Sequence, residues 1–282
     1  MAIYLYRLSE RMLSSVYLFV CKFRFLYNHF VSNIYLSVVI PSYNEKANLR
    51  KGVLDKVQHF LEKQKYKSEV IVVDDGSTDG SIEFTDKFIK DNPSFRLIKN
   101  SHLGKAGAVT SGMLGATGDN VLFMDMDQAT PIEEVDKLFP FLNEYDIVIG
   151  SRGSKRKGDP WTRLLMARGM MILRSLIVGI GGISDTQCGF KLFKKKASDD
   201  LFLKLKNFHH GYKTISGSSV KAGFDVELLF LAQKTGYKIK EVPVEWFYVE
   251  SRRVNPLRDS IEAMQDLLII KINDFSGKYK NL

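Results

Sequence analysis

The chain has 282 residues, 45% of them hydrophobic and 26% charged, a composition typical of a globular protein with one large domain or two small ones. Lys and Arg outnumber Asp and Glu by 41 to 32, and this excess of +9 favours an anionic partner: a nucleic acid, a phosphorylated substrate or an anionic membrane surface. The two cysteines, Cys21 and Cys188, are too few for a disulfide framework or a cysteine-rich zinc site and favour a reducing compartment.

Residues 1–34 form a segment rich in Tyr, Phe, Leu and Val, with basic residues interspersed. Two interpretations stay open: an amphipathic helix in a membrane interface, or a helix packed on its own domain. The best candidate for a spanning helix, residues 12–21, falls short of the roughly 20 apolar residues required. We therefore expect neither a transmembrane anchor nor a cleaved signal peptide.

From Leu36 onward, apolar strands alternate with amphipathic helices, which predicts an α/β domain over residues 35–255. The strands are expected at 36–40, 69–73, 95–98, 120–124 and 146–150. The helices are expected at 46–64, 81–90, 105–116, 132–142, 224–235 and 257–275, the last within an amphipathic C-terminal segment, 256–282. Such alternation is typical of a mostly parallel, Rossmann-like sheet with helices on both faces, in which ligands bind beyond the carboxyl ends of the strands.

Polar residues follow four of the predicted strands, at 41–45, 74–79, 104–107 and 125–127. Tyr43 can lie along a nucleobase and Asp75 can accept hydrogen bonds from it. Gly104 and Gly107 permit close approach of a helix N-terminus to phosphate, whereas Asp79 is expected only to cap the next helix. A Gly-x-Gly-x-x-Gly fingerprint is missing after the first strand, which argues against NAD.

Asp125 and Asp127 flank Met126 directly after the apolar fourth strand. Carboxylate oxygens are hard ligands that suit Mg²⁺ or Mn²⁺, and such ions bridge a few carboxylates to substrate phosphates. The pair therefore predicts a metal site that receives a nucleoside diphosphate. A solvated turn with two acids is the alternative.

The second half of the chain carries a basic stretch in which Asp159 is the only acid. It contains Arg152, Lys155, Arg156, Lys157, Arg163, Arg168 and Arg174. Residues 161–180 combine a broad apolar face with three of these arginines, which suits either a helix on a membrane beside an anionic headgroup or a buried helix with a solvated basic edge. Leu, Met and Ile rather than stacking aromatics lie between the charges, which argues against a nucleic-acid partner. His209 and His210 indicate a solvated loop.

The chain contains the motifs Pro41-Ser42-Tyr43-Asn44-Glu45, Asp74-Asp75-Gly76-Ser77, Asp125-Met126-Asp127 and Gly150-Ser151-Arg152. Together they resemble the inverting GT-A glycosyltransferases and, within them, the dolichyl-phosphate hexose synthases. The resemblance covers residues 35–275. Residues 185–191 and 224–229 look most like the branch that transfers glucose.

The resemblance assigns a donor site, with nucleotide contacts from Pro41, Tyr43, Glu45, Val73, Asp75, Lys105 and Asp125. It also implies that Asp125 and Asp127 bind Mg²⁺ or Mn²⁺. In the related mannose synthases, a Gln two residues past the second Asp is a further ligand. Here Ala129 stands at that position and Gln128 one place earlier, so the third protein ligand stays open.

For the acceptor phosphate, the resemblance implies contacts from Arg152, Arg163, Arg168, Ser251 and Arg252. Arg252 replaces a usual Lys and keeps its charge, whereas Ala167 replaces a Ser and removes a hydroxyl. A phosphate monoester is largely ionised at neutral pH and needs no general base. Asp127, Arg152, Arg163 and Asp185 are the expected catalytic group. Asp185 would position groups or contact the donor, or act as a base if the acceptor were a sugar hydroxyl. Cys188 is interpreted as a small buried residue and Glu227 as a cap or core-edge acid.

The resulting hypothesis is a metal-dependent inverting glycosyltransferase that moves glucose from UDP-glucose to dolichyl or polyprenyl phosphate. We expect it to be cytoplasmic and peripheral on the cytoplasmic face of a membrane. Alternatives are mannosyl transfer from GDP-mannose, transfer to a saccharide hydroxyl, and a non-catalytic nucleotide-binding or membrane-scaffold protein. The sequence has no readable signature of an oligomeric state.

Overall fold

The structure is a computed structural model that describes residues 34–152, 169, 171, 173–213, 223–247 and 256–280. The predictions for residues 1–33 lie outside the described residues.

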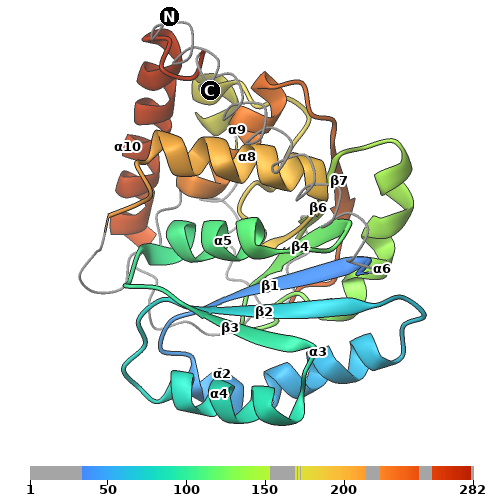
Figure 1. The fold of residues 1–282 in the computed structure, drawn as a ribbon. Helices are drawn as coiled ribbons and strands as arrows, with labels where there is room; N and C mark the ends of the chain where they lie inside the picture. The colour runs from blue at the N-terminus through green and yellow to red at the C-terminus, as the bar shows by residue number, and fades with distance from the viewer. Residues whose placement is uncertain are drawn as a thin grey trace, which may run out of the picture.

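A seven-stranded sheet forms the centre of the molecule (Figure 1). Its strands are β1 (Leu36–Ser42), β2 (Ser68–Asp74), β3 (Phe95–Lys99), β4 (Asn120–Met124), β5 (Ile147–Ser151), β6 (Phe190–Lys194) and β7 (Ile239–Pro243). In space they run in the order β3-β2-β1-β4-β6-β5-β7, and all pairs are parallel except those of β6 with β4 and β5. The predicted mostly parallel sheet and its first five strands are confirmed, while β6 and β7 were not predicted.

Helices cover both faces of the sheet (Figure 1). One face carries α2 (Lys46–Arg50), α3 (Val53–Glu62), α4 (Ser81–Asp91) and α6 (Val135–Leu138), the last flanked by the 3-10 helices η1 (Ile132–Glu134) and η2 (Phe139–Asn143). The opposite face carries α5 (Gly104–Gly115), α8 (Lys195–Phe208), α9 (Gly223–Lys234) and α10 (Pro256–Phe275).

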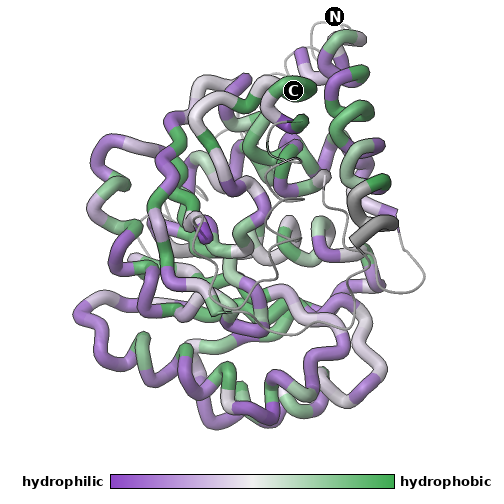
Figure 2. Tube along the Cα trace, turned by 180° about the vertical axis from the view of Figure 1, so that it is seen from behind, coloured by the Kyte–Doolittle hydropathy of each residue, from purple (hydrophilic) through white to green (hydrophobic). Residues whose placement is uncertain are grey.

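Alternation along the strands divides the core into these two layers. Val38 and Ile40 of β1 face the α3 side, and Val39 between them faces the α5 side, all three fully buried. Figure 2 shows hydrophobic residues gathered on the central strands and mainly hydrophilic ones on the outer turns of the helices. Burial on both faces explains why these strands read as continuous apolar runs in the sequence.

Two predicted helices are wrong in detail. The helix expected at 46–64 is divided because Gly52 adopts a left-handed backbone with a φ of 74° between α2 and α3. The helix expected at 132–142 is a short α-helix between two 3-10 helices, the second of which has Pro140 in its first turn. Proline lacks the N–H that a continuing α-helix would need.

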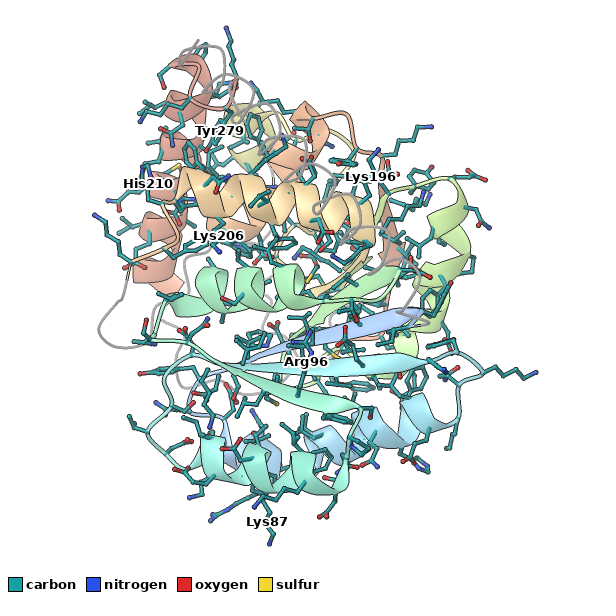
Figure 3. All side chains as sticks on the ribbon, viewed as in Figure 1. Lys87, Arg96, Lys196, Lys206, His210 and Tyr279 are labelled. Carbon is teal, nitrogen blue, oxygen red and sulfur yellow. The ribbon has the colours of Figure 1, made fainter. Side chains whose placement is uncertain are left out.

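A polar cluster around Glu227 holds the turn that follows the C-terminal helix on the domain. Glu227 of α9 is buried. Its carboxylate accepts a hydrogen bond from the Tyr279 hydroxyl (2.5 Å) and pairs with His209 Nε2 (2.7 Å). Tyr279, labelled in Figure 3, is 4% exposed, and burial next to the Glu227 carboxylate raises its pKa. His209 and His210 lie in a turn after α8, as predicted, and His210 is exposed, whereas His209 is half-buried because its ring pairs with a buried acid.

Among the described residues, no helix combines the length and the apolarity needed to cross a bilayer. The helix predicted at the C-terminus is confirmed as α10, which leaves several apolar side chains exposed. They are Ile261, Leu268, Ile269, Ile272 and Phe275. At 100° per residue these positions fall on one face of the helix.

Candidate active site

A pocket opens where the carboxyl ends of β4 and β5 meet the start of β6. Its volume is about 150 Å³. The lining residues are Asp125, Asp127, Ala129, Thr130, Arg152, Gln187, Gly189 and Trp246. Two predicted metal ligands and one predicted acceptor-binding arginine thus lie in the same pocket.

Asp125 is fixed by contacts with β6 and α5. Its backbone N–H donates to the carbonyl of Gly189 (3.1 Å), and its Oδ1 pairs with Lys105 Nζ at 2.7 Å. A Cβ at Gly189 would lie 1.8 Å from Asp125 Oδ2, so the carboxylate occupies the space that any other side chain at 189 would fill. Asp127, at the pocket mouth, is exposed and accepts a bond from the Ala129 N–H (3.0 Å).

The charges of this group are strongly coupled. Although Asp127 is exposed, its pKa is raised because neighbouring pocket atoms partly desolvate its carboxylate and because Asp125 repels a second negative charge. Burial acts to lower the pKa of Lys105, but Asp125 and the more distant Asp225 outweigh it and raise that pKa. The ammonium of Lys105 therefore offsets part of the negative charge of the two carboxylates that line the pocket.

The residues present fit a divalent cation that is bound together with a nucleotide. Among the described residues there is no cluster of three or more His, Cys, Asp or Glu that could enclose a metal ion. Mg²⁺, however, is commonly held by one or two carboxylates plus substrate phosphates and water. Asp125 and Asp127 can supply the two carboxylates. The mutual repulsion of these acids favours a cation between them.

Gln128 does not face the pocket. It has a φ of 50°, and its Nε2 donates to the carbonyl of Val53 (2.8 Å) on the α3 side. Ala129, which lies at the pocket instead, has no side-chain ligand to offer, and the glutamine among the lining residues is Gln187.

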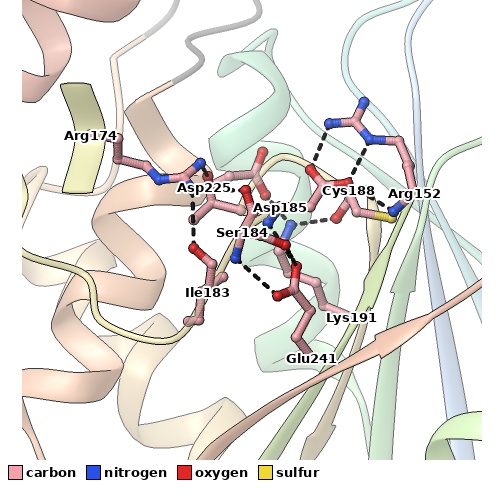
Figure 4. A network of polar contacts seen from close by, with 10 residues as sticks. Arg152, Arg174, Ile183, Ser184, Asp185, Cys188, Lys191, Asp225 and Glu241 are labelled. Carbon is pink, nitrogen blue, oxygen red and sulfur yellow. Dashed lines mark hydrogen bonds and ion pairs between the residues drawn. The ribbon is translucent and has the colours of Figure 1, made fainter. Parts of the chain in front are cut away.

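Arg152 belongs to the pocket wall, where Asp185 holds its side chain (Figure 4). Arg152 donates to both oxygens of Asp185 through Nε (2.8 Å) and Nη2 (2.7 Å), and its backbone N–H donates to Oδ2 (2.9 Å). Burial acts to lower the pKa of Arg152, but this bidentate pair raises it. The guanidinium also lies over the Trp246 ring, 5.9 Å from its centroid.

Behind this wall, Glu241 of β7 fixes the loop that carries Asp185. It accepts the backbone N–H groups of Ser184 (2.9 Å) and Asp185 (2.7 Å). Arg174 donates to Thr186 Oγ1 (2.7 Å) and to the carbonyl of Ser184 (2.8 Å) and is only 8% exposed (Figure 4). Arg174 is therefore buried inside the domain, so neither the solvated basic edge nor the headgroup contact considered for residues 161–180 applies to this arginine.

The residues predicted to bind the nucleoside lie at the carboxyl ends of β1 and β2 and on the loops that follow them. Val73 and Pro41 are register partners in these strands. Tyr43 stacks on His102, with ring centroids 4.3 Å apart and planes 18° apart. Glu45 accepts a bond from Asn48 Nδ2 (2.6 Å).

Asp75 is buried and connects the loop after β2 to the segment that enters α5. Its oxygens accept the backbone N–H groups of Leu103 and Gly104 (2.7 Å each), and Oδ2 lies 3.0 Å from His102 Nδ1. Asp75 thus caps α5, and two of the N–H groups expected near a phosphate bind this carboxylate. Gly107 packs on Leu103, which leaves no room for a Cβ. Asp79 is confirmed as a cap, since it accepts the N–H groups of Ser81 and Lys46 (3.0 Å each).

Four predicted acceptor residues, Arg163, Arg168, Ser251 and Arg252, lie outside the described residues. Sequence reasoning missed His102, Thr130 and Trp246. Trp246, one of two tryptophans in the chain and close to the basic motif at 250–252, was the one available signal. Cys188 is confirmed as a small buried residue, and burial raises the pKa of its thiol to about 11.

Residues 37–202 match the model of the protein family described as Glycosyl transferase family 2. The chain belongs to glycosyl transferase family 2. Curated relatives named dolichyl-phosphate beta-glucosyltransferase share 32% identity over 271 residues (Dictyostelium discoideum; 89% of this chain, 78% of the relative) and 33% over 270 residues (Saccharomyces cerevisiae; 88% and 77%). The human protein of the same name shares 33% over 267 residues (87% and 77%). The predicted resemblance to this group is confirmed.

Solved structures of the same architecture confirm the GT-A fold of this family 2 glycosyltransferase. Glucosyl-3-phosphoglycerate synthase from Mycobacterium tuberculosis, in complex with uridine diphosphate, aligns with a TM-score of 0.57 at 19% identity, covering 85% of this chain and 81% of that one. Mannosyl-3-phosphoglycerate synthase from Rubrobacter xylanophilus aligns with a TM-score of 0.56 at 15% identity, covering 87% and 75%.

Proposed function

We propose that this glycosyltransferase transfers glucose from UDP-glucose to dolichyl or polyprenyl phosphate, with inversion, at the cytoplasmic face of a membrane. The observation that carries the proposal is that Asp125, Asp127 and Arg152 line one pocket. A donor diphosphate and an acceptor phosphate are both anions, so their approach requires cations on both sides of the reacting carbon. The names of the curated relatives support the glucosyl group and the dolichyl phosphate.

On the donor side, Pro41, Tyr43, Glu45, Val73 and Asp75 would hold the nucleoside. Asp125 and Asp127 would hold Mg²⁺ or Mn²⁺, which when bound neutralises the diphosphate and makes it a better leaving group. Their position directly after β4, beside the loops that follow β1 and β2, supports this assignment.

On the acceptor side, Arg152 would hold the phosphate, together with Arg163, Arg168, Ser251 and Arg252. A phosphate monoester is a ready oxyanion at neutral pH, so no residue has to remove its proton. Asp185 would then orient Arg152 rather than act as a base. Its two oxygens already accept three N–H groups from Arg152, which supports an orienting role.

Two apolar surfaces support a lipid acceptor over a saccharide. A groove of about 420 Å³ lies beside Ser184 and Glu241, with Leu176, Ile180 and Ile183 among its lining residues. Ser184 and Glu241 also belong to the network that ends at Arg152 (Figure 4). The exposed apolar face of α10 is of the kind that binds at a membrane interface.

A partition assay with labelled sugar tests the proposal. The full-length protein is incubated with dolichyl phosphate, Mn²⁺ and either UDP-[¹⁴C]glucose or GDP-[¹⁴C]mannose, and label is counted in the organic phase. We expect label from UDP-glucose alone. It should be lost in Asp127→Asn and kept in Asp91→Asn, which removes an exposed charge at the end of α4.

Each other outcome refutes a stated part of the proposal. Label in the organic phase from GDP-mannose would show that the proposed donor is wrong. Label that stays in the aqueous phase on a saccharide would show that the proposed lipid acceptor is wrong. Unchanged turnover in Asp127→Asn would remove the metal from the mechanism.

A further inference from the structure

Lys105 forms an ion pair with Asp125, one of the two carboxylates that are expected to bind the metal. Its Nζ lies 2.7 Å from Asp125 Oδ1, and the two side chains are 24% and 36% exposed. The ammonium also lies over the ring of Phe123, 5.4 Å from the centroid. Asp125 and the aromatic ring thus hold the ammonium of Lys105 beside a residue that lines the pocket.

The position of Lys105 in its helix does not explain its presence. It is the second residue of α5, at the end of the helix where the dipole is positive and a cation is unfavourable. The first turn of α5 contains no acid, and the anion that satisfies it is Asp75 from another loop. Lys105 therefore matches the charge of Asp125 rather than that of its own helix.

The charge balance of the pocket depends on this lysine. A divalent cation that arrives alone meets an aspartate whose charge is already neutralised, and must compete with an ammonium at contact distance. A diphosphate that arrives with the cation offers Lys105 new anionic oxygens. The flexible four-carbon stem of lysine permits such a change of partner.

We propose that Lys105 is an internal counter-cation that makes metal binding depend on the nucleoside diphosphate. Without the diphosphate, Lys105 pairs with Asp125 and weakens metal binding. With the diphosphate, Lys105 pairs with its oxygens and releases Asp125 to the metal. This inference rests on the proposed function and adds a positioning residue that links its two ligands.

Thermodynamic linkage gives the inference a measurable form. If uridine diphosphate (UDP) strengthens Mn²⁺ binding by a given factor, Mn²⁺ must strengthen UDP binding by the same factor. We expect a coupling factor of at least about tenfold in the wild-type protein, within the usual range for coupled sites. Lys105→Met removes the competing ammonium, so Mn²⁺ alone should bind about tenfold more tightly, and the coupling factor should shrink accordingly.

Electron paramagnetic resonance of free Mn²⁺, titrated into the full-length protein with and without UDP, measures both quantities. Lys105→Arg keeps the charge and should retain the wild-type pattern. Lys99→Met is the matched control, because it removes a lysine from an exposed ion pair with Asp86 outside the pocket. Thermal melting of each variant checks that it is folded.

Mn²⁺ binding by Lys105→Met that is no tighter than wild type, or an unchanged coupling factor, would overturn the proposal. A Lys105→Met protein that does not fold leaves the test to Lys105→Gln, with the same expected direction. The partition assay for glucosyl transfer reports separately on the proposed function. If the wild-type protein gives no labelled lipid but the Mn²⁺–UDP coupling depends on Lys105 as expected, only the proposed function is refuted. If the wild-type protein labels lipid but the coupling does not depend on Lys105, only the role of Lys105 is refuted.

Discussion

Gly189→Ala should disable the pocket while leaving the fold in place. The backbone of Gly189 does not adopt a positive φ, so alanine fits its conformation, but the new Cβ would lie 1.8 Å from Asp125 Oδ2. The strand cannot move away easily, because the Gly189 carbonyl accepts the Asp125 N–H at 3.1 Å. The carboxylate must therefore rotate out of its position and away from Lys105.

The expected cost differs between stability and catalysis. An off-rotamer Asp125 costs about 1 kcal/mol, and loss of its partly exposed pair with Lys105 at most about 1 kcal/mol more. For a protein of 282 residues, a loss of about 1 to 2 kcal/mol corresponds to a fall in Tm of roughly 2 to 4 °C. Misplacing a preorganised charge at the diphosphate should lower kcat/KM about 100-fold, or about 2.7 kcal/mol.

Calorimetry and the glucosyl partition assay measure these two effects. Gly181→Ala is the matched control, because its Cβ would meet no heavy atom within 4 Å and its φ is not positive. Full activity of Gly189→Ala at an unchanged Tm would refute the reasoning, since it would mean that the carboxylate of Asp125 is not needed where the structure places it.

Three further predictions concern groups around the site and the C-terminal helix. Tyr279→Phe removes a hydrogen bond to the buried Glu227 carboxylate and should lower the free energy of unfolding in urea by about 2 kcal/mol. The pKa of Cys188 is raised from 9.0 to about 11, so the folded protein holds this proton more tightly than the unfolded chain. The contribution of the protonated Cys188 thiol to stability is therefore complete below pH 9 and is lost as the pH rises to about 11. Peptide mapping after thiol labelling at pH 8 should find Cys188 unlabelled until the protein unfolds. His102→Ala removes the ring that stacks on Tyr43 and should weaken UDP binding up to about tenfold by calorimetry, whereas equal affinity would contradict a role for the stack.

The first five strands could be predicted because burial on both faces makes them continuous apolar runs. β6 was missed because Lys191 interrupts its pattern, yet this side chain is fully buried and pairs with Asp225 (2.5 Å) and the Cys188 carbonyl (2.6 Å). Asp225 lies on α9, far from Lys191 in the sequence, so no local sequence pattern shows that this lysine can be buried. β7 was missed because it is an edge strand with a partly exposed pattern that ends at Pro243.

The candidate site divides in the same way. Asp125, Asp127 and Arg152 directly follow strands with clear patterns, so their convergence could be predicted from the topology of the sheet. Trp246 reaches the pocket only through the pairing of β7 with β5 and the bond from the Phe247 N–H to the Ala129 carbonyl (2.8 Å). The side chain of Gln128 points away from the pocket toward Val53 because its backbone adopts a positive φ, which the sequence does not specify.

The reversed direction of β6 brings distant parts of the chain together at the pocket. β5 ends and β6 begins at the same end of the sheet, so Arg152, directly after β5, and Gly189, directly before β6, both line the pocket. The residues that lead into β6 are not an independent insertion, because Val178, Ile180 and Ile183 pack in the core and Arg174 donates to Thr186. The same segment that completes the pocket therefore also closes the core, and substitutions in it should affect activity and stability together.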